Sequence, residues 1–176
     1  GDPLGLVDGM DSLRASTAHL SEAAGFAAPG VLIGAVAVHV AAWARVQAGG
    51  EPVAPDPTLS HAADYLRMLG LGSDAARVAG LDAYLATVAD HGLNASTFAA
   101  RVVTSTGSDL VSAVVAAIGA LKGPLHGGAP GPVLDMLDAV GSPADAAAWI
   151  DGELAAGRRI MGMGHRIYRV RDPRAA

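Results

Sequence analysis

Apolar residues recur at helical spacing along almost the entire chain. The pattern predicts helices near residues 11–24, 30–48, 60–69, 74–90, 95–106, 108–122, 132–140 and 143–156. In the most apolar of these segments, four residues that lie three or four positions apart form a single stripe: Leu110, Val114, Ile118 and Leu121. Alternating strand patterns are nearly absent, so the sequence predicts an all-α fold.

Polar residues, prolines and glycines mark several helix ends. Ser108 or Asp109 is placed to cap the most apolar helix. Ser142 and Pro143 fit the N-cap and the first position of the last helix, and Gly157 fits its end. These end signals support the helical assignment independently of the apolar spacing.

Composition restricts the kind of core and the kind of chemistry. Of the 176 residues 51% are apolar, but 38 residues are alanine and only 4% are aromatic. Such a core is built from closely approaching backbones rather than from large side chains. The absence of cysteine excludes disulfides, thiolate zinc sites and a cysteine nucleophile, and it fits a reducing compartment. No HExxH-type metal spacing is present, so no metal is expected.

The stretch of residues 27–44 carries no charge and reaches the length at which membrane spans begin. Because Pro29, Gly34 and His39 interrupt it, a buried helix is favoured over a membrane span. No n-region, apolar core and cleavage site precede the run, so no signal peptide is expected. The chain begins with Gly1 rather than methionine, which indicates processing, excision or an incomplete sequence.

His126 lies in the stretch GPLHGGAPGPVLDML. Gly127 and Gly128 allow positive φ and close approach of a ligand, and Pro130 and Pro132 lead into a predicted helix. The positive end of a helix dipole disfavours a protonated imidazole. We therefore expect a neutral hydrogen-bond donor that could stabilise an enol or enolate oxygen. A turn that merely reverses the chain explains the same residues equally well.

His165 lies in the stretch GMGHRIYRVRDPR, among most of the chain's arginines. Six of the twelve basic residues fall between positions 158 and 176, although the net charge of the chain is −5. Gly162 and Gly164 give access to the backbone, and the arginines can hold carboxylates or phosphates through paired hydrogen bonds. Their positive field also disfavours protonation of the His165 ring.

A solvated basic tail and a nucleic-acid surface are the alternatives for this arginine cluster. A nucleic-acid surface would have Tyr168 as its single aromatic residue. An acidic chain with only one basic cluster disfavours that alternative, so no nucleic-acid partner is expected.

His91 opens the stretch DHGLNASTFAAR. Gly92 fits the end of one helix, Asn94 or Ser96 fits the cap of the next, and a helix N-terminus attracts anions. Capping alone also explains these residues. The remaining histidines are interpreted as hydrogen-bonded structural residues: His19, His39 and His61.

Taken in order, the stretches around His91, His126 and His165 resemble the citrate synthase family, including its 2-methylcitrate synthase members. The resemblance covers most of the chain. It implies an all-α, citrate synthase-like multi-helical fold of which this chain is a truncated part. Residues 1–122 would belong to the large helical domain, and residues 123–176 would begin the small domain.

This resemblance implies a transferase that condenses an acyl-CoA with a 2-oxo acid, acetyl-CoA with oxaloacetate giving citrate and CoA. His126 would hydrogen-bond the thioester oxygen, and His165 would polarise the oxaloacetate ketone. His91 and Arg174 would bind the oxo acid. The expected CoA-binding residues are Met161, Gly162, Met163, Gly164 and Arg169, of which the arginine would meet a phosphate.

No separate cofactor is expected, since the CoA thioester is itself a substrate. A homodimer, a cytoplasmic location and a place in the tricarboxylic acid cycle are expected, and no membrane partner is. Propionyl-CoA differs from acetyl-CoA by one methylene, worth about 1–3 kcal/mol in an apolar pocket. The sequence therefore leaves 2-methylcitrate synthesis open.

In the family, an aspartate well past the GHR motif takes a proton from the acetyl methyl group, and these 176 residues do not include it. Asp172 belongs to the motif already matched and is not that base. We therefore expect the 176-residue chain alone to be inactive. The alternatives are a non-catalytic truncated paralogue that acts as a dimerisation or regulatory partner, and a protein that is simply longer than this sequence.

Overall fold

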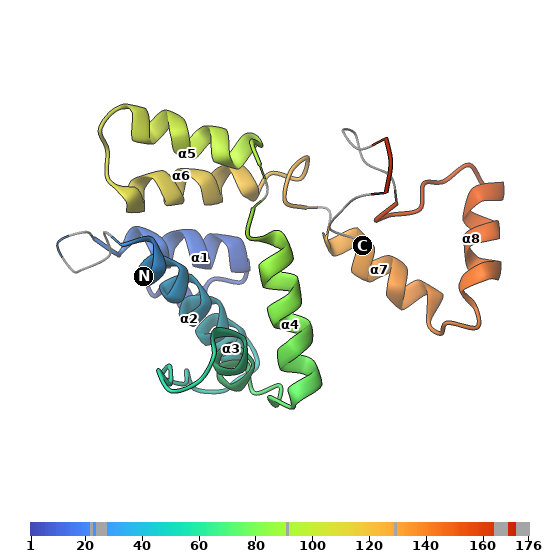
Figure 1. Ribbon diagram of the computed structural model, residues 1–176, viewed down its shortest axis with the longest axis horizontal. Coiled ribbons are helices and arrows are strands. Elements are labelled where there is room, and N and C mark those ends of the chain that lie inside the picture. The colour runs from blue at the N-terminus through green and yellow to red at the C-terminus, as the bar shows by residue number, and fades with distance from the viewer. Residues whose placement is uncertain (22, 24–27, 91, 129, 164–168, 172–176) are drawn as a thin grey trace. The chain divides into compact units, whose positions relative to one another are not determined.

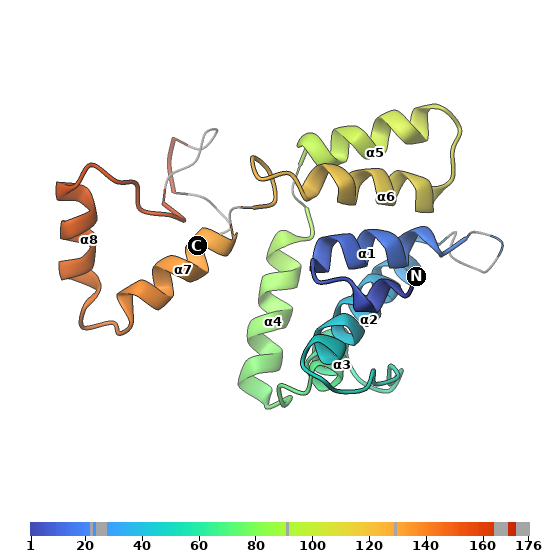
Figure 2. The same cartoon turned by 180° about the vertical axis from the view of Figure 1, so that it is seen from behind.

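The computed structural model describes residues 1–21, 23, 28–90, 92–128, 130–163 and 169–171. Within these residues the chain forms α-helices, short 3-10 segments and no strand, which confirms the predicted all-α class (Figures 1 and 2). The elements are η1 Pro3–Gly5, α1 Gly9–Ala18, α2 Pro29–Gln47, α3 His61–Leu69, α4 Ala75–Val88, α5 Ala95–Ser105, α6 Leu110–Leu121, α7 Pro130–Val140 and α8 Ala146–Ala155.

The chain divides into two compact units, residues 1–120 and residues 121–176, and each is described by itself. The expected assignment of residues 1–122 to a large domain and 123–176 to a small domain stays a prediction. The first unit holds the helices from η1 to most of α6. The second unit holds α7, α8 and the segments around them.

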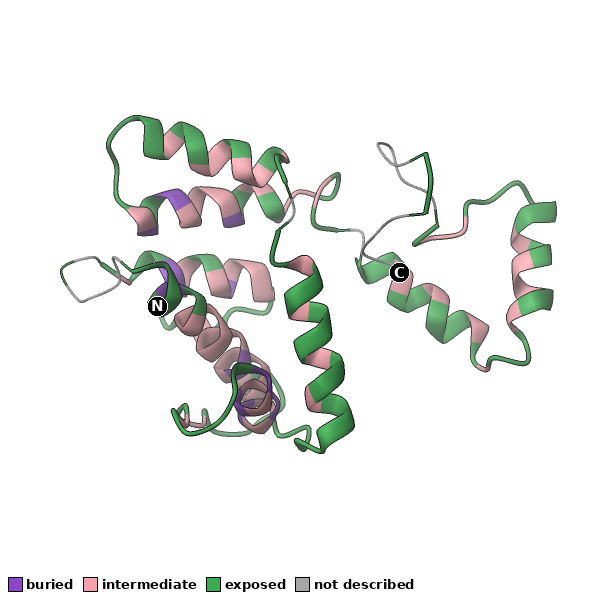
Figure 3. Ribbon diagram, viewed as in Figure 1, coloured by how far each residue is buried: buried purple, intermediate pink, exposed green. Residues whose placement is uncertain are grey.

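The core of the first unit lies around α2, which contacts α1, α3 and η1. Figure 3 shows the buried positions on α1, α2, α3 and α6. The buried apolar residues in the described part of the chain are Leu32, Ala41, Ala62, Leu66, Met68, Val111, Ala113 and Ile118. Ala41 and Ala62 are almost completely buried, at 1% and 0% exposure. Small side chains therefore carry much of the core, as the alanine-rich composition suggests.

Aromatic packing and hydrogen bonds hold the N-terminal segment on α2. A Cβ atom at Gly9 would lie 3.0 Å from the Trp43 ring, so α1 approaches the indole closely only because position 9 is glycine. The Trp43 Nε1 donates to the Leu6 carbonyl at 2.8 Å, and the Gln47 side chain donates to the Leu4 carbonyl at 3.1 Å. These contacts fix η1 and α1 against α2.

A second set of contacts fixes α3 on α2. The Arg45 Nε donates to the Met68 carbonyl at 2.5 Å, near the C-terminal end of α3. Gly70 follows the helix with a positive φ of 79°, and a Cβ there would lie 3.1 Å from the Arg45 guanidinium. A cation at this end of α3 complements the partial negative charge of the last carbonyls.

By length and composition, α2 is the one described helix that could cross a membrane, which by itself is weak evidence for a span. Leu32 and Ala41 are buried on it, and residues 34–46 are otherwise half-buried. Residues 49–60 connect α2 to α3. An Arg67 Nη2 donates to the Ala54 carbonyl at 2.6 Å and ties this connection to α3.

Three sequence predictions need correction. The last helix begins at Ala146 rather than Pro143, because the Ser142 hydroxyl donates to the Asp145 carboxylate at 2.6 Å within a turn. The preceding helix begins at Pro130 rather than Pro132, since residues of the first turn need no intrahelical N–H. The first long helix ends at Ala18, well before residue 24.

The predicted stripe on α6 is also wrong in part. Val111 and Ile118 are buried, whereas Leu121 is 39% exposed. The helix is apolar on nearly every side, so spacing alone did not identify the buried face. Of the two predicted caps, Asp109 is the one used: its carboxylate accepts the Ser112 N–H at 2.8 Å.

His39 on α2 makes the stability of the first unit depend on pH. Its ring is half-buried, its Nδ1 has no hydrogen-bond partner in the described part of the chain, and burial lowers its pKa. A lowered pKa means that the unfolded chain binds the proton more readily. The stability that neutral His39 contributes is therefore present above the pKa of the unfolded state, about 6.5. It is lost as the pH falls through the lower pKa of the folded state.

The expected result is a free energy of unfolding that decreases between about pH 7 and pH 5. Replacing His39 with glutamine should make that decrease smaller, because the titrating group is gone. Urea unfolding of both proteins across this range measures the effect. Identical pH slopes would contradict it.

Candidate functional site

His126 lies in a tight turn that follows α6 directly. The His126 N–H donates to the Gly123 carbonyl at 2.9 Å, and the Gly127 N–H donates to the Leu121 carbonyl at 3.0 Å. The His126 residue is half-buried, while Leu125 beside it is fully exposed. The imidazole is therefore carried by a hydrogen-bonded turn rather than by an open loop.

Close backbone contacts constrain the two glycines that follow His126. Neither Gly127 nor Gly128 has a positive φ. Instead, a Cβ at position 127 would lie only 2.2 Å from the Leu121 carbonyl oxygen, and one at position 128 would lie 3.1 Å from the Pro124 carbonyl oxygen. Neither glycine uses the positive φ that its type allows, and close backbone contact within the turn is what constrains both positions.

The segment Met161–Met163 lies close to the helix that the His126 turn leads into. Gly162 has a φ of 77°, and a Cβ there would lie 3.7 Å from the Val133 side chain on α7. Met161 is half-buried and Met163 is 67% exposed. In the sequence, α7 lies between the glycines after His126 and the segment around Gly162. In space, the Val133 side chain in the first turn of α7 lies close to Gly162.

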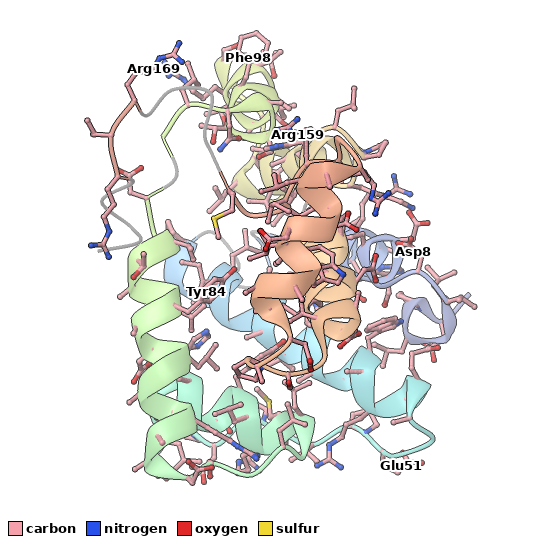
Figure 4. The ribbon with its side chains drawn as sticks, turned by 90° about the vertical axis from the view of Figure 1, so that its right-hand side faces the viewer. Asp8, Glu51, Tyr84, Phe98, Arg159 and Arg169 are labelled. Carbon is pink, nitrogen blue, oxygen red and sulfur yellow. The ribbon has the colours of Figure 1, made fainter. Side chains whose placement is uncertain are left out.

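Two of the arginines in the predicted anion-binding cluster behave differently. Arg158 donates to both carboxylate oxygens of Glu153 at 2.6 and 2.7 Å. This pairing lowers the pKa of Glu153 and raises the pKa of Arg158. Arg169 is exposed, and its side chain extends away from the backbone (Figure 4). Arg158 therefore closes the end of α8, whereas Arg169 is accessible to a ligand.

The Arg158 contact could have been anticipated from the sequence. Gly157 ends α8 with a φ of 69°, and the Arg158 N–H returns to the Glu153 carbonyl at 2.9 Å. This arrangement is common where a glycine ends a helix. It places the residue that follows the glycine, here Arg158, beside the residue five positions earlier, here Glu153. The predicted helix stop at Gly157 is thereby confirmed.

Several predicted site residues lie outside the described residues: His91, Gly164, His165 and Arg174. Around His91, Gly92 has a φ of 60° and Asn94 caps α5 by accepting the Thr97 N–H at 3.0 Å. Asn94 is thus the cap among the two candidates. The proposed roles of His91 and His165 remain predictions.

Within the described residues, no cluster of three or more histidine, cysteine, aspartate or glutamate side chains is arranged to hold a metal ion. The described residues offer one half-buried imidazole on a hydrogen-bonded turn, exposed guanidinium groups and a glycine-rich segment. An imidazole N–H can donate to a developing oxyanion, and a guanidinium can bind a phosphate or carboxylate.

The described fold and turn define an all-α, multi-helical protein that carries a histidine between α6 and α7. A family model described as the citrate synthase C-terminal domain matches residues 6–176. The chain therefore belongs to the citrate synthase family.

Curated relatives of two kinds are similar to the chain. The citrate synthase of Haloferax volcanii is 50% identical over 139 residues, which are 77% of this chain and 36% of that protein. The 2-methylcitrate synthase of Mycobacterium tuberculosis is 48% identical over 131 residues, which are 74% of this chain and 33% of that protein. The chain thus spans about a third of the length of these relatives.

Solved structures agree with the family assignment. Citrate synthase from Thermotoga maritima superposes with a TM-score of 0.74 at 34% identity, covering 98% of this chain and 48% of that one. The enzyme from Thermoplasma acidophilum, solved as a ternary complex with carboxymethyl coenzyme A and oxaloacetate, gives a TM-score of 0.69 at 28% identity, covering 98% of this chain and 47% of that one.

Proposed function

We propose that the chain is part of an enzyme that condenses acetyl-CoA with oxaloacetate to give citrate and free CoA. The observation that carries the proposal is the family match over residues 6–176, within which the His126 turn is folded. The Thermoplasma acidophilum relative was solved with a CoA derivative and oxaloacetate, and those two ligands are the substrate classes of this proposal.

The reaction joins two carbon atoms and then releases a thiol. A base takes a proton from the acetyl methyl group, and the resulting enol carbon attacks the ketone carbon of oxaloacetate. The ketone oxygen takes up a proton, and water then cleaves the thioester to give the new carboxylate and CoA. Groups that stabilise the two reacting oxygens therefore lower the barrier.

We assign the predicted residues to these steps. His126 donates a hydrogen bond to the thioester oxygen as the enol forms, and His165 donates to the ketone oxygen. His91 and Arg174 bind the oxo acid. The residues proposed to border CoA are Met161, Gly162, Met163, Gly164 and Arg169. The carboxylate that accepts the methyl proton is not assigned among the described residues.

Release of CoA thiol from acetyl-CoA and oxaloacetate tests the proposal. A protein with the full length of its citrate synthase relatives that contains these residues, called the family-length protein below, should release thiol only when both substrates are present. The 176-residue chain alone should not turn over, because it spans about a third of its relatives and the methyl-proton acceptor is unassigned in it. Thiol release by neither protein would contradict the proposed function. Full activity of the 176-residue chain would contradict the second expectation.

Propionyl-CoA is the alternative acyl donor. The citrate synthase and 2-methylcitrate synthase relatives are similarly close, at 50% and 48% identity, so similarity does not choose between the two. One methylene in an apolar pocket changes kcat/KM by about 10- to 200-fold. The ratio of kcat/KM for the two thioesters therefore identifies the substrate.

We further propose that the protein acts as a cytoplasmic homodimer and needs no separate cofactor. Phe98 and Val102, one helical turn apart on α5, are 63% and 49% exposed, and Figure 4 shows the Phe98 ring pointing outward. Large apolar side chains grouped in this way favour burial against another surface.

The dimer proposal predicts that Phe98→Asp shifts a family-length protein toward monomer, because a charge cannot be buried in an apolar contact without a partner. Sedimentation velocity at micromolar concentration measures the change. Replacing exposed Glu51 with lysine is the matched surface control and should leave the dimer intact. A Phe98→Asp protein that sediments like the parent would contradict the proposed role of this face.

A further inference from the structure

The turn that carries His126 is closed by an unusually close backbone contact. The Gly127 N–H donates to the Leu121 carbonyl, the last carbonyl of α6, at 3.0 Å. A Cβ at position 127 would lie 2.2 Å from that same oxygen and 3.0 to 3.1 Å from the Leu121 side chain. The Gly127 N–H can therefore approach the Leu121 carbonyl this closely because glycine has no Cβ.

This crowding is specific to one position. A Cβ at Gly128 would lie 3.1 Å from the Pro124 carbonyl oxygen, a contact that a small shift relieves. At Gly119 on α6 and Gly131 on α7, nothing lies within 4 Å of an added Cβ. Among the four glycines compared, position 127 alone requires a backbone contact to lengthen by at least 0.8 Å, from 2.2 Å to 3.0 Å, before an alanine fits.

The contact bears directly on the imidazole. His126 lies between its own N–H bond to the Gly123 carbonyl and the Gly127 bond to the Leu121 carbonyl. With hydrogen bonds on both sides, the backbone of His126 has little freedom, and the direction of its Cα–Cβ bond follows from the end of α6. Displacing Gly127 would therefore displace the ring.

We propose that Gly127 is a positioning residue, which holds the His126 ring at the thioester by hydrogen-bonding the last carbonyl of α6. The inference rests on the proposed function. A donor to a developing oxyanion works only within a few tenths of an ångström of its productive place. A misplacement of about 1 Å lowers the rate about a hundredfold.

The experiment uses a family-length protein with Gly127→Ala, with Gly128→Ala as a milder variant and Gly119→Ala as the matched control. We expect kcat to fall about a hundredfold for the first and less for the second, while KM for oxaloacetate stays near the parent value and Gly119→Ala matches the parent. Circular dichroism establishes whether each variant keeps its helices. A Gly127→Ala protein with parental kcat would overturn the inference.

Two further measurements separate the carbonyl contact from ordinary side-chain crowding. Adding Leu121→Ala to Gly127→Ala removes the Leu121 side chain but leaves its carbonyl, so no recovery of kcat is expected, and recovery would overturn the inference. The ring signals of His126 in long-range ¹H–¹⁵N spectra should shift in Gly127→Ala and not in Gly119→Ala. If the parent protein releases no thiol, the proposed function fails, and these ring signals alone decide whether Gly127 places His126.

Discussion

Replacing His126 with alanine is expected to lower kcat of a family-length protein about 10²- to 10³-fold, which is the usual cost of removing one donor to a developing oxyanion. KM for oxaloacetate should change little, because the proposed contact of His126 is with the thioester. The alanine leaves both backbone hydrogen bonds of the turn possible, since they use the main chain. Steady-state thiol release with each substrate varied in turn measures both constants.

His19→Ala is the matched control for this prediction. His19 is exposed at the end of α1, and its ring Nδ1 lies 2.7 Å from the local Ala15 carbonyl oxygen. It should keep the parental kcat. If His126→Ala also keeps the parental kcat while the parent is active, His126 is a turn residue and not a catalytic one.

Replacing Asp64 with alanine is expected to lower the free energy of unfolding by about 2–3 kcal/mol. The Asp64 carboxylate is 12% exposed and accepts two bonds from Arg67, at 2.9 and 2.6 Å. It also accepts the Asp56 N–H at 3.0 Å, which joins the 49–60 connection to α3. Alanine would leave that N–H without its acceptor and Arg67 with only its bond to Ala54.

The control for Asp64 is Asp11→Ala. Asp11 pairs with Arg14 at 2.9 Å with the same three-residue spacing, but the two side chains are 31% and 47% exposed. An exposed pair contributes about 0–1 kcal/mol, so this variant should lose much less stability. Urea unfolding of the 176-residue chain measures both. Equal losses would show that burial of Asp64 is not what makes its contacts matter.

The helices were predictable because each is coded by nearby residues. Apolar spacing placed all of the observed α-helices, and local caps such as Ser60 and Asp74, which accept the Ala63 and Arg77 amides, fix their starts. Helix boundaries were less predictable where a polar side chain could form either of two hydrogen bonds. Ser142 could have capped a helix, but it bonds Asp145 in a turn instead.

The candidate site was predictable as a set of segments and not as a geometry. The motif around His126 marked a turn before a helix, which the structure confirms. The reason for Gly127 was not predictable, because the group that crowds it is the Leu121 carbonyl oxygen. Every residue has such an oxygen, so the sequence does not show which one lies close to Gly127. The pairing of Arg158 with Glu153, by contrast, follows from the helix stop at Gly157, a signal that the arginine count alone does not include.

The sequence by itself thus determined the helical class, the order of the helices and the family resemblance, because periodicity, caps and motifs are properties of neighbouring residues. Only the tertiary structure decided which face of α6 is buried and why Gly127 must be glycine. Those outcomes depend on atoms brought together by packing and by the return of the backbone on itself, and residue order does not record such distances.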